Sequence, residues 1–593
     1  MKDRQKGHNK RCSQQFYVSG APTAANEKCW VLRDNVPTMV RSRHQFSELP
    51  ERVIVAPVYV KVDASWFNPT STDLPTTARF GYSSRSLARA GTSRRLQKVL
   101  QPNTKATTKS PSAPVTSRPR HVLGTDAPTT EATYAIAHSV QALGGRAVIV
   151  GGAVRDMLRG ALLATSPSAI DVDIEVFGIS PAQLRDLLSR SYRVDTTGAA
   201  FEVLKVHVPG TPHPLDVSMP RRERATGPSR RDFDVSADPT LSFAQAAARR
   251  DFTIGAMGYD PLSGELLDPY GGAADLAAKV LRHVSPAFEE DPLRVLRAAR
   301  FAARFDLTVH PHTAQLARNL RSRADQISME RIFQELDSTL DQALTPGRGL
   351  HVLKDVNWID LFAPLANLRG VAQDPTWHPE GDVFIHTAHV LDFWSKNLRT
   401  GNKDDDRVVA FAALCHDFGK ATTTTFDPST RRYRAHGHES AGVAPARELL
   451  CSYGQPRLAA AIVPLIENHL APVQLGQELK PSARAVRRLA TRVGRIDLLV
   501  ALAKADQGGR PPKDPSSALE ACDRLLDQAR TLNVTTTAPQ RLASGDHLIE
   551  LGLSPSKSFK ELLDAAYEAQ LDGLITTEAE ARSFLESRLN ESR

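Results

Sequence analysis

The chain has 593 residues, which is too long for one hydrophobic core, so we expect several domains. Its formal net charge of +9 comes from residues 1–120, which hold 21 of the 75 Lys/Arg but only 7 of the 66 Asp/Glu, leaving 54 basic and 59 acidic residues downstream. The overall charge therefore does not make the downstream part a general nucleic-acid binder, and any such function must come from local sites.

The cysteine pattern and the hydropathy indicate the compartment. The five cysteines are widely spaced and form no CxxC pair, which favours a reducing environment. No apolar run approaches the ~20 residues that span a bilayer, and the N-terminus lacks the apolar segment of a secretory signal. We therefore expect a soluble, cytoplasmic protein with no membrane association. The sequence does not indicate an oligomeric state.

Residues 1–120 are rich in Ser, Thr, Pro and Arg, and their only strand-like piece is "RVIVAPVYVKV". Such a composition rarely buries enough surface to offset the ordering entropy of the chain. We expect a disordered basic leader, or a start codon placed too early. An RNA-attracting arm or a targeting segment is the alternative.

Residues 121–260 alternate between helix and strand patterns and predict a compact α/β domain. Three segments are typical of helices: "TTEATYAIAHSVQALGG", "AVRDMLRG" ending at Gly160, and "SPAQLRDLLSRS" capped by Ser180. Four segments are typical of strands: "RAVIVGG", "DVDIEVFG", "FEVLKVHV" and "LDVSM". Beyond residue 260 strand patterns disappear, and segments such as "AADLAAKVLRHV", "DPLRVLRAARFAARF" and "SMERIFQELDSTLDQAL" have helical spacing.

The predicted strand "IDVDIEVFG" carries Asp171 and Asp173 on one face. Residues two apart on a strand lie about 7 Å apart along the backbone, and like charges so placed repel each other. Two such carboxylates can converge on divalent cations about 3.5–4 Å apart, the arrangement for in-line phosphoryl or nucleotidyl transfer, and Mg²⁺ accepts such sparse ligation. Taken alone, this pair is more simply a solvated strand face.

The upstream segment "VGGAVRD" adds a phosphate-binding pattern. Gly151 and Gly152, between a buried strand and a helix, let backbone N–H groups approach a phosphate, and a helix N-terminus favours that anion. Arg155, one turn into the helix, can add a charge-assisted bond to a triphosphate. The glycine pair alone would be an ordinary tight turn, but the turn, the arginine and the two aspartates together are more specific.

These motifs occur in order with "RRDFTIGAMGYD", "LLDPYGGAADL" and "EEDPLRVLRAARFAARF". The sequence strongly resembles the class II tRNA nucleotidyltransferases, the bacterial CCA-adding enzymes and their poly(A) polymerase relatives of the polymerase-β-like superfamily. The resemblance implies a polymerase-β-like α/β head followed by an all-α neck and body. It also implies that Asp171 and Asp173 bind catalytic Mg²⁺ and that Gly152 and Arg155 hold the triphosphate.

In that family, protein side chains read the base without a nucleic-acid template, through a motif ED-x-x-R that here matches Glu290, Asp291 and Arg294. Residues three apart share one face of a helix. A carboxylate that accepts from an exocyclic amine, beside a guanidinium donor, can match C and A and reject U and G.

Further arginines follow at the same spacing. The resemblance assigns nucleotide contacts to Arg297 and Arg300, and a triphosphate or ribose contact to Arg250 of the "RRD" segment. A basic stripe on a solvated helix is the alternative for the first two. The family motif places Asn where this chain has Gly255, which puts sugar discrimination in question, and the segment between Gly160 and Asp171 is longer than usual.

The histidines gather between residues 378 and 469 in a second pattern. Neutral imidazoles with an aspartate suit divalent transition metals, and the spacing H…HD…D resembles the HD phosphohydrolase superfamily. The resemblance nominates as metal ligands His386, His416, Asp417 and Asp506, with His438 and His469 for a second metal. The metal expected there is Ni, Co, Mn or Fe. Lys420 could assist phosphate binding, and His389 is expected to be a local polar residue.

The sequence predicts an enzyme that adds C and A to tRNA 3′ ends from CTP and ATP, with an HD phosphatase or cyclic phosphodiesterase activity. The alternatives are a CC-only, A-only or poly(A)-adding enzyme, and a degenerate RNA-binding protein. The expected domains, in chain order, are a disordered leader (1–120), a nucleotidyltransferase head (121–260), a nucleotide-selecting helical neck (261–310), a helical RNA-binding body (311–375), an HD domain (376–510) and a helical tail (511–593).

Overall fold

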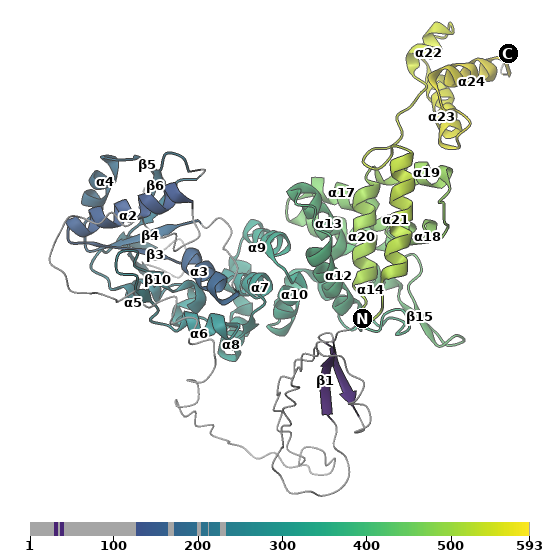
Figure 1. Ribbon diagram of the computed structural model, residues 1–593. Helices are drawn as coiled ribbons and strands as arrows, with labels where there is room; N and C mark the ends of the chain where they lie inside the picture. The colour runs from purple at the N-terminus through teal and green to yellow at the C-terminus, as the bar shows by residue number, and fades with distance from the viewer. Residues whose placement is uncertain are drawn as a thin grey trace, which may run out of the picture. The chain divides into compact units, whose positions relative to one another are not determined.

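The computed structural model describes residues 29–33, 36–40, 126–163, 171–197, 203–211, 213–225 and 233–591 (Figure 1). The chain divides into two compact units, residues 1–85 and 86–593. In the first unit the described residues form an antiparallel hairpin of β1 (Cys29–Arg33) and β2 (Val36–Val40). The strand-like segment expected at 52–62, the rest of the leader and most of the long segment before Asp171 lie outside the described residues.

The α/β domain is built on a seven-stranded mixed sheet with the strand order β11-β10-β3-β4-β7-β6-β5. Its central strand β4 pairs antiparallel with β3 and parallel with β7, and this pairing sets Asp173 opposite Asp216. The strands of the sheet are β3 (Arg146–Val150), β4 (Asp173–Phe177), β5 (Arg193–Thr197), β6 (Val203–His207), β7 (Leu215–Ser218), β10 (Gly258–Tyr259) and β11 (Leu266–Leu267). A separate hairpin is formed by β8 (Arg221–Ala225) and β9 (Phe233–Ala237).

Helices flank this sheet, and α2 and α3 contact β3 while α4 contacts β5. The predicted cap is confirmed, because Ser180 accepts from the backbone of Gln183 in a capping box at the start of α4. The prediction that the second helix stops at Gly160 is wrong, since α3 continues for three more residues. The helices of the domain are α2 (Ala127–Ala142), α3 (Gly152–Leu163), α4 (Pro181–Ser189), α5 (Phe243–Ala247) and α6 (Gly272–Ala277).

The chain beyond residue 260 is mostly helical, with short strands that the sequence pattern did not predict. The segment "AADLAAKVLRHV" is not one helix, because Lys279 adopts a positive φ of 56° and the chain continues into β12 (Val280–Leu281), which pairs with β13 (Thr308–Val309). The next helices are α7 (Leu293–Phe305), α8 (Pro311–Asn319), α9 (Met329–Gln342), α10 (Pro346–Asp355) and α11 (Ala363–Ala366). Both α9 and α10 pack on α7.

Residues 383–531 form a helical domain around α12, α13 and α20, which contact one another. Close packing of α20 on α12 requires glycine, since a Cβ at Gly508 would lie 2.4 Å from the ring of Phe393. The helices are α12 (Val383–Asn397), α13 (Lys403–Cys415), α14 (Lys420–Thr423), α15 (His438–Ala441), α16 (Val443–Ser452), α17 (Pro456–Glu467), α18 (Ala471–Leu475), α19 (Ala483–Val493), α20 (Ile496–Gly508) and α21 (Ser516–Thr531). A small hairpin is formed by β14 (Thr425–Asp427) and β15 (Arg432–Arg434).

One segment, Pro456–Leu475, is long and apolar enough to cross a membrane by length and composition, although the sequence analysis found no such run. The structure divides it into α17 and α18, and Ile462 and Ile466 of α17 lie in the same hydrophobic core as α12 and α20. Its length and composition are therefore those of a core segment of this helical domain.

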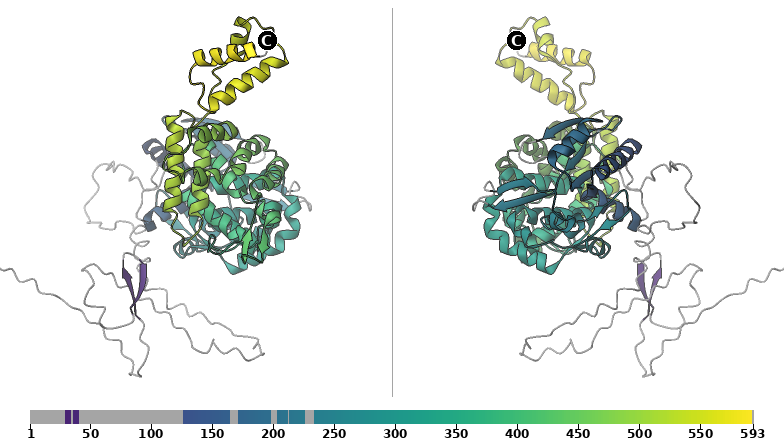
Figure 2. Two further views of the ribbon diagram at one scale, coloured as in Figure 1. Left: turned by 90° about the vertical axis from the view of Figure 1, so that its right-hand side faces the viewer. Right: turned by 90° about the vertical axis from the view of Figure 1, so that its left-hand side faces the viewer.

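The last three helices, α22 (Gly545–Glu550), α23 (Lys557–Leu571) and α24 (Glu578–Glu591), pack around a small core of their own (Figure 2). Leu548, Ala581 and Leu585 are fully buried in it. The last part of the helical tail predicted from the sequence therefore has its own apolar centre, whereas α21, which that prediction also assigned to the tail, packs on α20 of the helical domain.

Candidate active sites

A cavity of about 590 Å³ opens where β3, β4 and β7 meet the segments around residues 249–255 and the start of α7. Of the predicted residues in this region, it is lined by Gly152, Arg155, Asp173, Arg250, Asp291, Arg294 and Arg297. Asp171 and Arg300 are not among its lining residues. The structure thus brings together most of a set that is spread over some 145 positions of the sequence.

The turn between β3 and α3 forms one wall of this cavity. Gly151 has a φ of 70°, which favours glycine, and a Cβ there would lie 3.2 Å from Nη1 of Arg250. Gly152 is the first residue of α3, so the first turn of that helix borders the cavity. Arg155 is buried, bonds both oxygens of Asp156 at 2.9 Å, and lies 4.3 Å from the ring centroid of Phe305.

The two predicted aspartates are not both on the strand. Both side chains are exposed, but Asp173 is the first residue of β4 whereas Asp171 precedes the strand, which corrects the prediction that both share a strand face. Sequence reasoning missed Asp216, which lies opposite Asp173 on β7 and bonds Lys205 at 3.0 Å. Its position in the "LDVS" strand was visible, but the pairing of β4 with β7 was not.

The electrostatics of this carboxylate group fit a cation. Burial, and then the charges of Asp216 and Asp171, raise the pKa of Asp173 to about 6, although Arg250 opposes the shift. Carboxylates crowded in this way without a counter-charge favour the protonated form. Oxygen ligands from a few carboxylates are what Mg²⁺ prefers, so the residues present suit that ion.

Arg250 is held toward the cavity by buried groups. Its Nη2 lies 3.2 Å from Glu175, which shares the face of β4 with Asp173 but is fully covered, and its Nη1 donates to the carbonyl of Gly255 at 3.1 Å. Gly255 also lines the cavity, and a Cβ there would meet only Asp251 at 3.8 Å. The missing asparagine is therefore not imposed by packing.

Asp291 and Arg294, the predicted base-reading pair, are not carried by the same element. Asp291 has extended backbone angles (φ −126°, ψ 104°) between a short 3-10 helix and α7, so Asp291 and Arg294 do not share one helix as predicted. Nevertheless both line the cavity. Asp291 lies 3.2 Å from Arg331 of α9, and Arg294 donates to the carbonyls of Ala287 at 2.6 Å and Arg249 at 2.9 Å.

The other charged residues predicted around the start of α7 have different surroundings. Arg297 lines the cavity and pairs with Asp251 at 2.7 Å. Arg300 instead pairs with Glu335 of α9 at 2.9 Å, and Glu290 is exposed and absent from the cavity wall. Arg331 lines the cavity from α9 although no sequence motif pointed to it, since only tertiary packing brings α9 beside α7.

The six predicted ligands of the histidine region converge in the helical domain. Ligand atoms of His386, His416 and Asp506 lie within 4.8 Å of one another, and so do those of Asp417, His438 and His469. They come from α12, from the turn after α13, from α15, from the turn after α17, and from α20. The adjacent His416–Asp417 pair directly follows the last residue of α13.

The two groups adjoin at Asp417. Its Oδ2 lies 3.2 Å from Nε2 of His416, and its Oδ1 lies 3.5 Å from Nε2 of His438. Oδ1 of Asp417 and Nε2 of His416 are buried without a hydrogen-bond partner. Buried acceptors without partners are costly, so this cluster suits a bound metal. Lys420, which was expected near a phosphate, lies 2.8 Å from Oδ2 of Asp417.

The charge states of the cluster also suit metal ligands. Burial raises the pKa of Asp417, but His416 and Lys420 outweigh it and hold that pKa well below its ordinary value. Burial, and then the neighbouring His416, lower the pKa of His469 to about 3, so this imidazole is neutral at pH 7. Metal binding needs an ionised carboxylate and a neutral imidazole.

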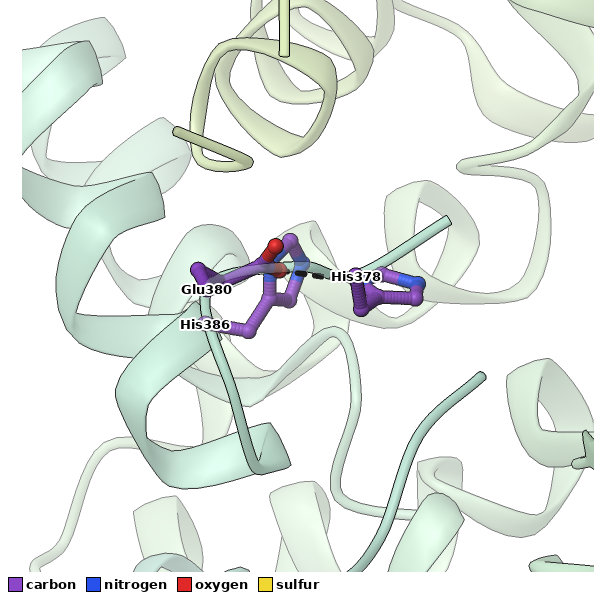
Figure 3. A group of neighbouring side chains, drawn as sticks. All are labelled: His378, Glu380 and His386. Carbon is purple, nitrogen blue, oxygen red and sulfur yellow. Dashed lines mark hydrogen bonds and ion pairs between the residues drawn. The ribbon is translucent and has the colours of Figure 1, made fainter. Parts of the chain in front are cut away.

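The carboxylate of Glu380 contacts Nδ1 of the His386 imidazole, and the sequence analysis did not identify it. Figure 3 shows Glu380 between His378 and His386; its Oε1 lies 2.9 Å from Nδ1 of His378 and 2.8 Å from Nδ1 of His386. Burial raises the pKa of Glu380, but these two bonds lower it to about 2. A carboxylate on the far nitrogen of a ligating histidine fixes the tautomer of the ring. The "HPEGD" segment contained this glutamate, but only the fold places it behind His386.

Comparisons with known proteins agree with this geometry. A family model of the poly A polymerase head domain matches residues 147–282, and one of the HD domain matches residues 383–501. The structure thus defines a nucleotidyltransferase-type head joined to an HD-type helical domain.

Similar proteins include the multifunctional CCA proteins of Laribacter hongkongensis (36% identical, 66% of this chain and 92% of that protein), Nitrosococcus oceani (36%, 61% and 84%) and Xylella fastidiosa (39%, 51% and 68%). The chain belongs to this family of multifunctional CCA proteins. The structure of Bacillus stearothermophilus CCA-adding enzyme in complex with CTP shares the fold, with a TM-score of 0.56 at 21% identity over 79% of this chain and 99% of that one.

Proposed function

We propose that the protein is a template-independent tRNA nucleotidyltransferase that adds C and A to tRNA 3′ ends from CTP and ATP. The observation that carries the proposal is the cavity in which a glycine turn, carboxylates and arginines converge. The membership of the multifunctional CCA protein family supports it, as does the shared fold of a CCA-adding enzyme that binds CTP.

In the proposed reaction the tRNA 3′-hydroxyl attacks the α-phosphate of the nucleotide, a new P–O bond forms, and pyrophosphate leaves. Gly152 presents the N-terminus of α3 to the triphosphate, and Arg155 and Arg250 add charge. Asp171 and Asp173 would hold Mg²⁺, with Asp216 beside them. When bound, Mg²⁺ stabilises the charge on the transferring phosphate.

We assign base reading to Asp291 and Arg294, with Arg297 contacting the nucleotide. Arg294 lines the cavity, and its bonds to two backbone carbonyls fix the orientation of its guanidinium. Arg300 is better placed as a support for α9 through Glu335 than as a nucleotide contact.

Arg294→Ala should relax base selection. The change removes donors to the base edge but leaves the aspartates and the glycine turn in place, so slow addition should continue. Preference for CTP and ATP over UTP and GTP should fall by about tenfold or more, because the lost hydrogen bonds to the base contribute about 1–3 kcal/mol. Nucleotide competition on tRNA lacking CCA measures this.

Arg304→Ala is the matched control, because Arg304 lies on the same helix, bonds Gln342 and does not line the cavity. It should keep wild-type selectivity. Full selectivity at reduced rate in the Arg294→Ala protein would contradict the assignment and make Arg294 a positioning or phosphate residue.

The test of the proposed function uses three tRNA substrates, one lacking CCA and two ending in C or CC, with labelled CTP or ATP. A CCA-adding enzyme extends all three to CCA and stops. A CC-adding enzyme stops once the tRNA ends in CC. An A-adding enzyme extends only the tRNA that already ends in CC. A poly(A)-adding enzyme continues to add A beyond the CCA end. No incorporation would identify a degenerate RNA-binding protein.

We further propose that the HD-type domain is a metal-dependent phosphohydrolase, a phosphatase or cyclic phosphodiesterase. His386, His416, Asp417 and Asp506 would hold a divalent transition metal (Ni, Co, Mn or Fe), and His438 and His469 a second one. Oδ1 of Asp417 and Nε2 of His416, which are buried without a hydrogen-bond partner, support this assignment. A bound metal would polarise a phosphoryl oxygen and activate water.

The domain division that we propose follows these sites. The head takes residues 121–260, the neck 261–310, the body 311–375, the HD domain 376–510 and the tail 511–593. The matched family models at 147–282 and 383–501 support a head and an HD domain in these positions. Residues 1–120 are proposed to be dispensable for catalysis.

Deleting residues 1–120 should leave CCA addition near the full-length rate at physiological salt, because every residue that lines either cavity lies downstream. At low salt the full-length chain should be favoured, since the 21 Lys/Arg of residues 1–120 attract RNA. Kinetics of both chains at two salt concentrations check this. A truncated chain that fails to fold, or that loses most activity at physiological salt, would make the leader part of the enzyme.

A further inference from the structure

Arg155, which lines the cavity of the head from the first turn of α3, is held by two neighbouring side chains. Its own side chain is only 8% exposed. Asp156, the next residue of the helix, accepts from Nε and from Nη2 of Arg155, each at 2.9 Å. The ring of Phe305 on α7 lies against the guanidinium, with its centroid 4.3 Å from Cζ. The guanidinium is thus fixed by a carboxylate in its own plane and by an aromatic ring on one face.

Helix geometry alone does not produce the pairing of Arg155 with Asp156. Neighbouring residues on a helix point about 100° apart and do not face each other, so the arginine side chain must bend back to reach the carboxylate. The contact with Phe305 favours this conformation, because a guanidinium is attracted to the face of an aromatic ring. The pair therefore depends on the packing of α3 beside α7, and α7 itself lines the cavity through Arg294 and Arg297.

The edge of the guanidinium that Asp156 occupies determines which donors remain for a ligand. A guanidinium has five N–H groups, and Asp156 accepts from one on Nε and one on Nη2. The other three, on Nη1 and Nη2, bond no residue in the described part of the chain. Nη2 lies beside the glycine turn, since a Cβ at Gly152 would be 3.5 Å from it. The edge formed by Nη1 and Nη2 is therefore left for the cavity, and such an edge matches two oxygens of a phosphate.

Asp156 also balances the charge around Arg155. The guanidinium of Arg159, on the same helix, lies 5.6 Å from the centroid of the Phe305 ring. Two guanidinium groups at one ring repel each other, and the carboxylate of Asp156 offsets this repulsion. Its side chain is 27% exposed, so solvent screens it less than it screens a surface carboxylate. Without this charge, Arg155 would lose both its in-plane partner and the balance of its charge.

We propose that Asp156 is a positioning residue for nucleotide binding, which together with the ring of Phe305 directs the Nη1–Nη2 edge of Arg155 at the triphosphate. This inference rests on the proposed nucleotidyltransferase function, in which Arg155 contacts the triphosphate. Asp156 does not line the cavity, so it acts through Arg155 and not on the nucleotide itself. It should therefore govern the affinity for the triphosphate and leave base selection to other residues.

The test compares Asp156→Asn with the wild-type protein in the addition of CTP to tRNA lacking CCA. KM for CTP should rise by about tenfold with kcat nearly unchanged, because one charge-assisted contact to the triphosphate is weakened. Inorganic tripolyphosphate, which has no base, should lose affinity as a competitor by the same factor. The preference for CTP over UTP should stay at the wild-type value. Phe305→Leu, which keeps an apolar side chain but removes the ring, should raise KM for CTP in the same way.

Asp186→Asn is the matched control, because Asp186 pairs with Arg190 at the end of α4 in the same domain and does not line the cavity. It should keep the wild-type KM. In the double variant, Asp156→Asn should add nothing to the loss that Arg155→Gln causes alone, because residues that act as a unit are not additive. A further loss in the double variant would make Asp156 structural, and an unchanged KM in Asp156→Asn would also overturn the proposal.

A binding measurement separates this inference from the function on which it rests. If the wild-type protein incorporates neither C nor A, the proposed function fails. Calorimetric titration with CTP and Mg²⁺ then still decides the role of Asp156. The dissociation constant should rise about tenfold in Asp156→Asn and in Phe305→Leu and stay near wild type in Asp186→Asn. Thermal unfolding identifies a variant that does not fold, and the other then decides. Equal binding by all four proteins, or no binding by the wild type, would refute the inference.

Discussion

Asp173→Asn is expected to reduce nucleotide addition by more than about a hundredfold while phosphohydrolysis by the HD-type domain continues. Asp173 borders the cavity at the start of β4, where it lies opposite Asp216 of β7. An amide keeps the shape but removes the charge that would hold Mg²⁺ at the transferring phosphate. Single-turnover addition of labelled CTP to tRNA lacking CCA measures the loss.

Asp195→Asn is the control for this substitution, since Asp195 lies on β5 of the same sheet, bonds His207 and does not line the cavity. It should retain wild-type addition. Asp171→Ala extends the test to the aspartate that lies outside the strand. Residual transfer above about a hundredth of wild type in both the Asp173→Asn and the Asp171→Ala proteins would refute the two-metal assignment.

The parts of the fold that the sequence predicted are those with strong local signals. The Ser180 cap, the buried strand before Gly151 and the periodic helix at Leu293–Phe305 each depend on neighbours within a few positions. Their burial patterns and caps are therefore readable without the tertiary structure.

The site residues that the sequence analysis did not identify are placed by contacts between distant segments. Asp216 becomes part of the carboxylate group only because β7 pairs in parallel with β4, and Arg331 reaches the cavity only because α9 packs on α7. Glu380 precedes His386 by six residues in the chain, yet its position behind that imidazole depends on the turn before α12. Spacing along a chain cannot give such placements.

Two errors came from extending a regular pattern past its real end. Alternation predicted that Asp171 continues the strand of Asp173, and three-residue spacing predicted that Asp291 shares a helix with Arg294. In both cases the element begins later, and the side chain is carried by irregular backbone next to it. Catalytic groups commonly lie on such connecting segments, where the backbone can direct a side chain that a regular element could not.

Asp417→Asn should reduce the phosphohydrolase activity by at least about a hundredfold and leave CCA addition intact. Asp417 is the residue at which the two ligand groups adjoin, and its two oxygens are directed to His416 on one side and His438 on the other. An amide can supply one neutral oxygen, but it cannot supply the charge that both groups share, so bound metal should fall together with activity.

The readouts are metal content by elemental analysis of the purified protein and hydrolysis of adenosine 3′-phosphate with added Mn²⁺ or Ni²⁺. Asp527→Asn is the control, because Asp527 is an exposed partner of Arg530 on α21, outside the cluster. Since the Asp417 carboxylate is fully buried beside Lys420, thermal unfolding must show that the variant is folded before its loss of activity counts. A folded Asp417→Asn protein that keeps wild-type metal content and hydrolysis would show that the cluster is a buried polar network rather than a metal centre.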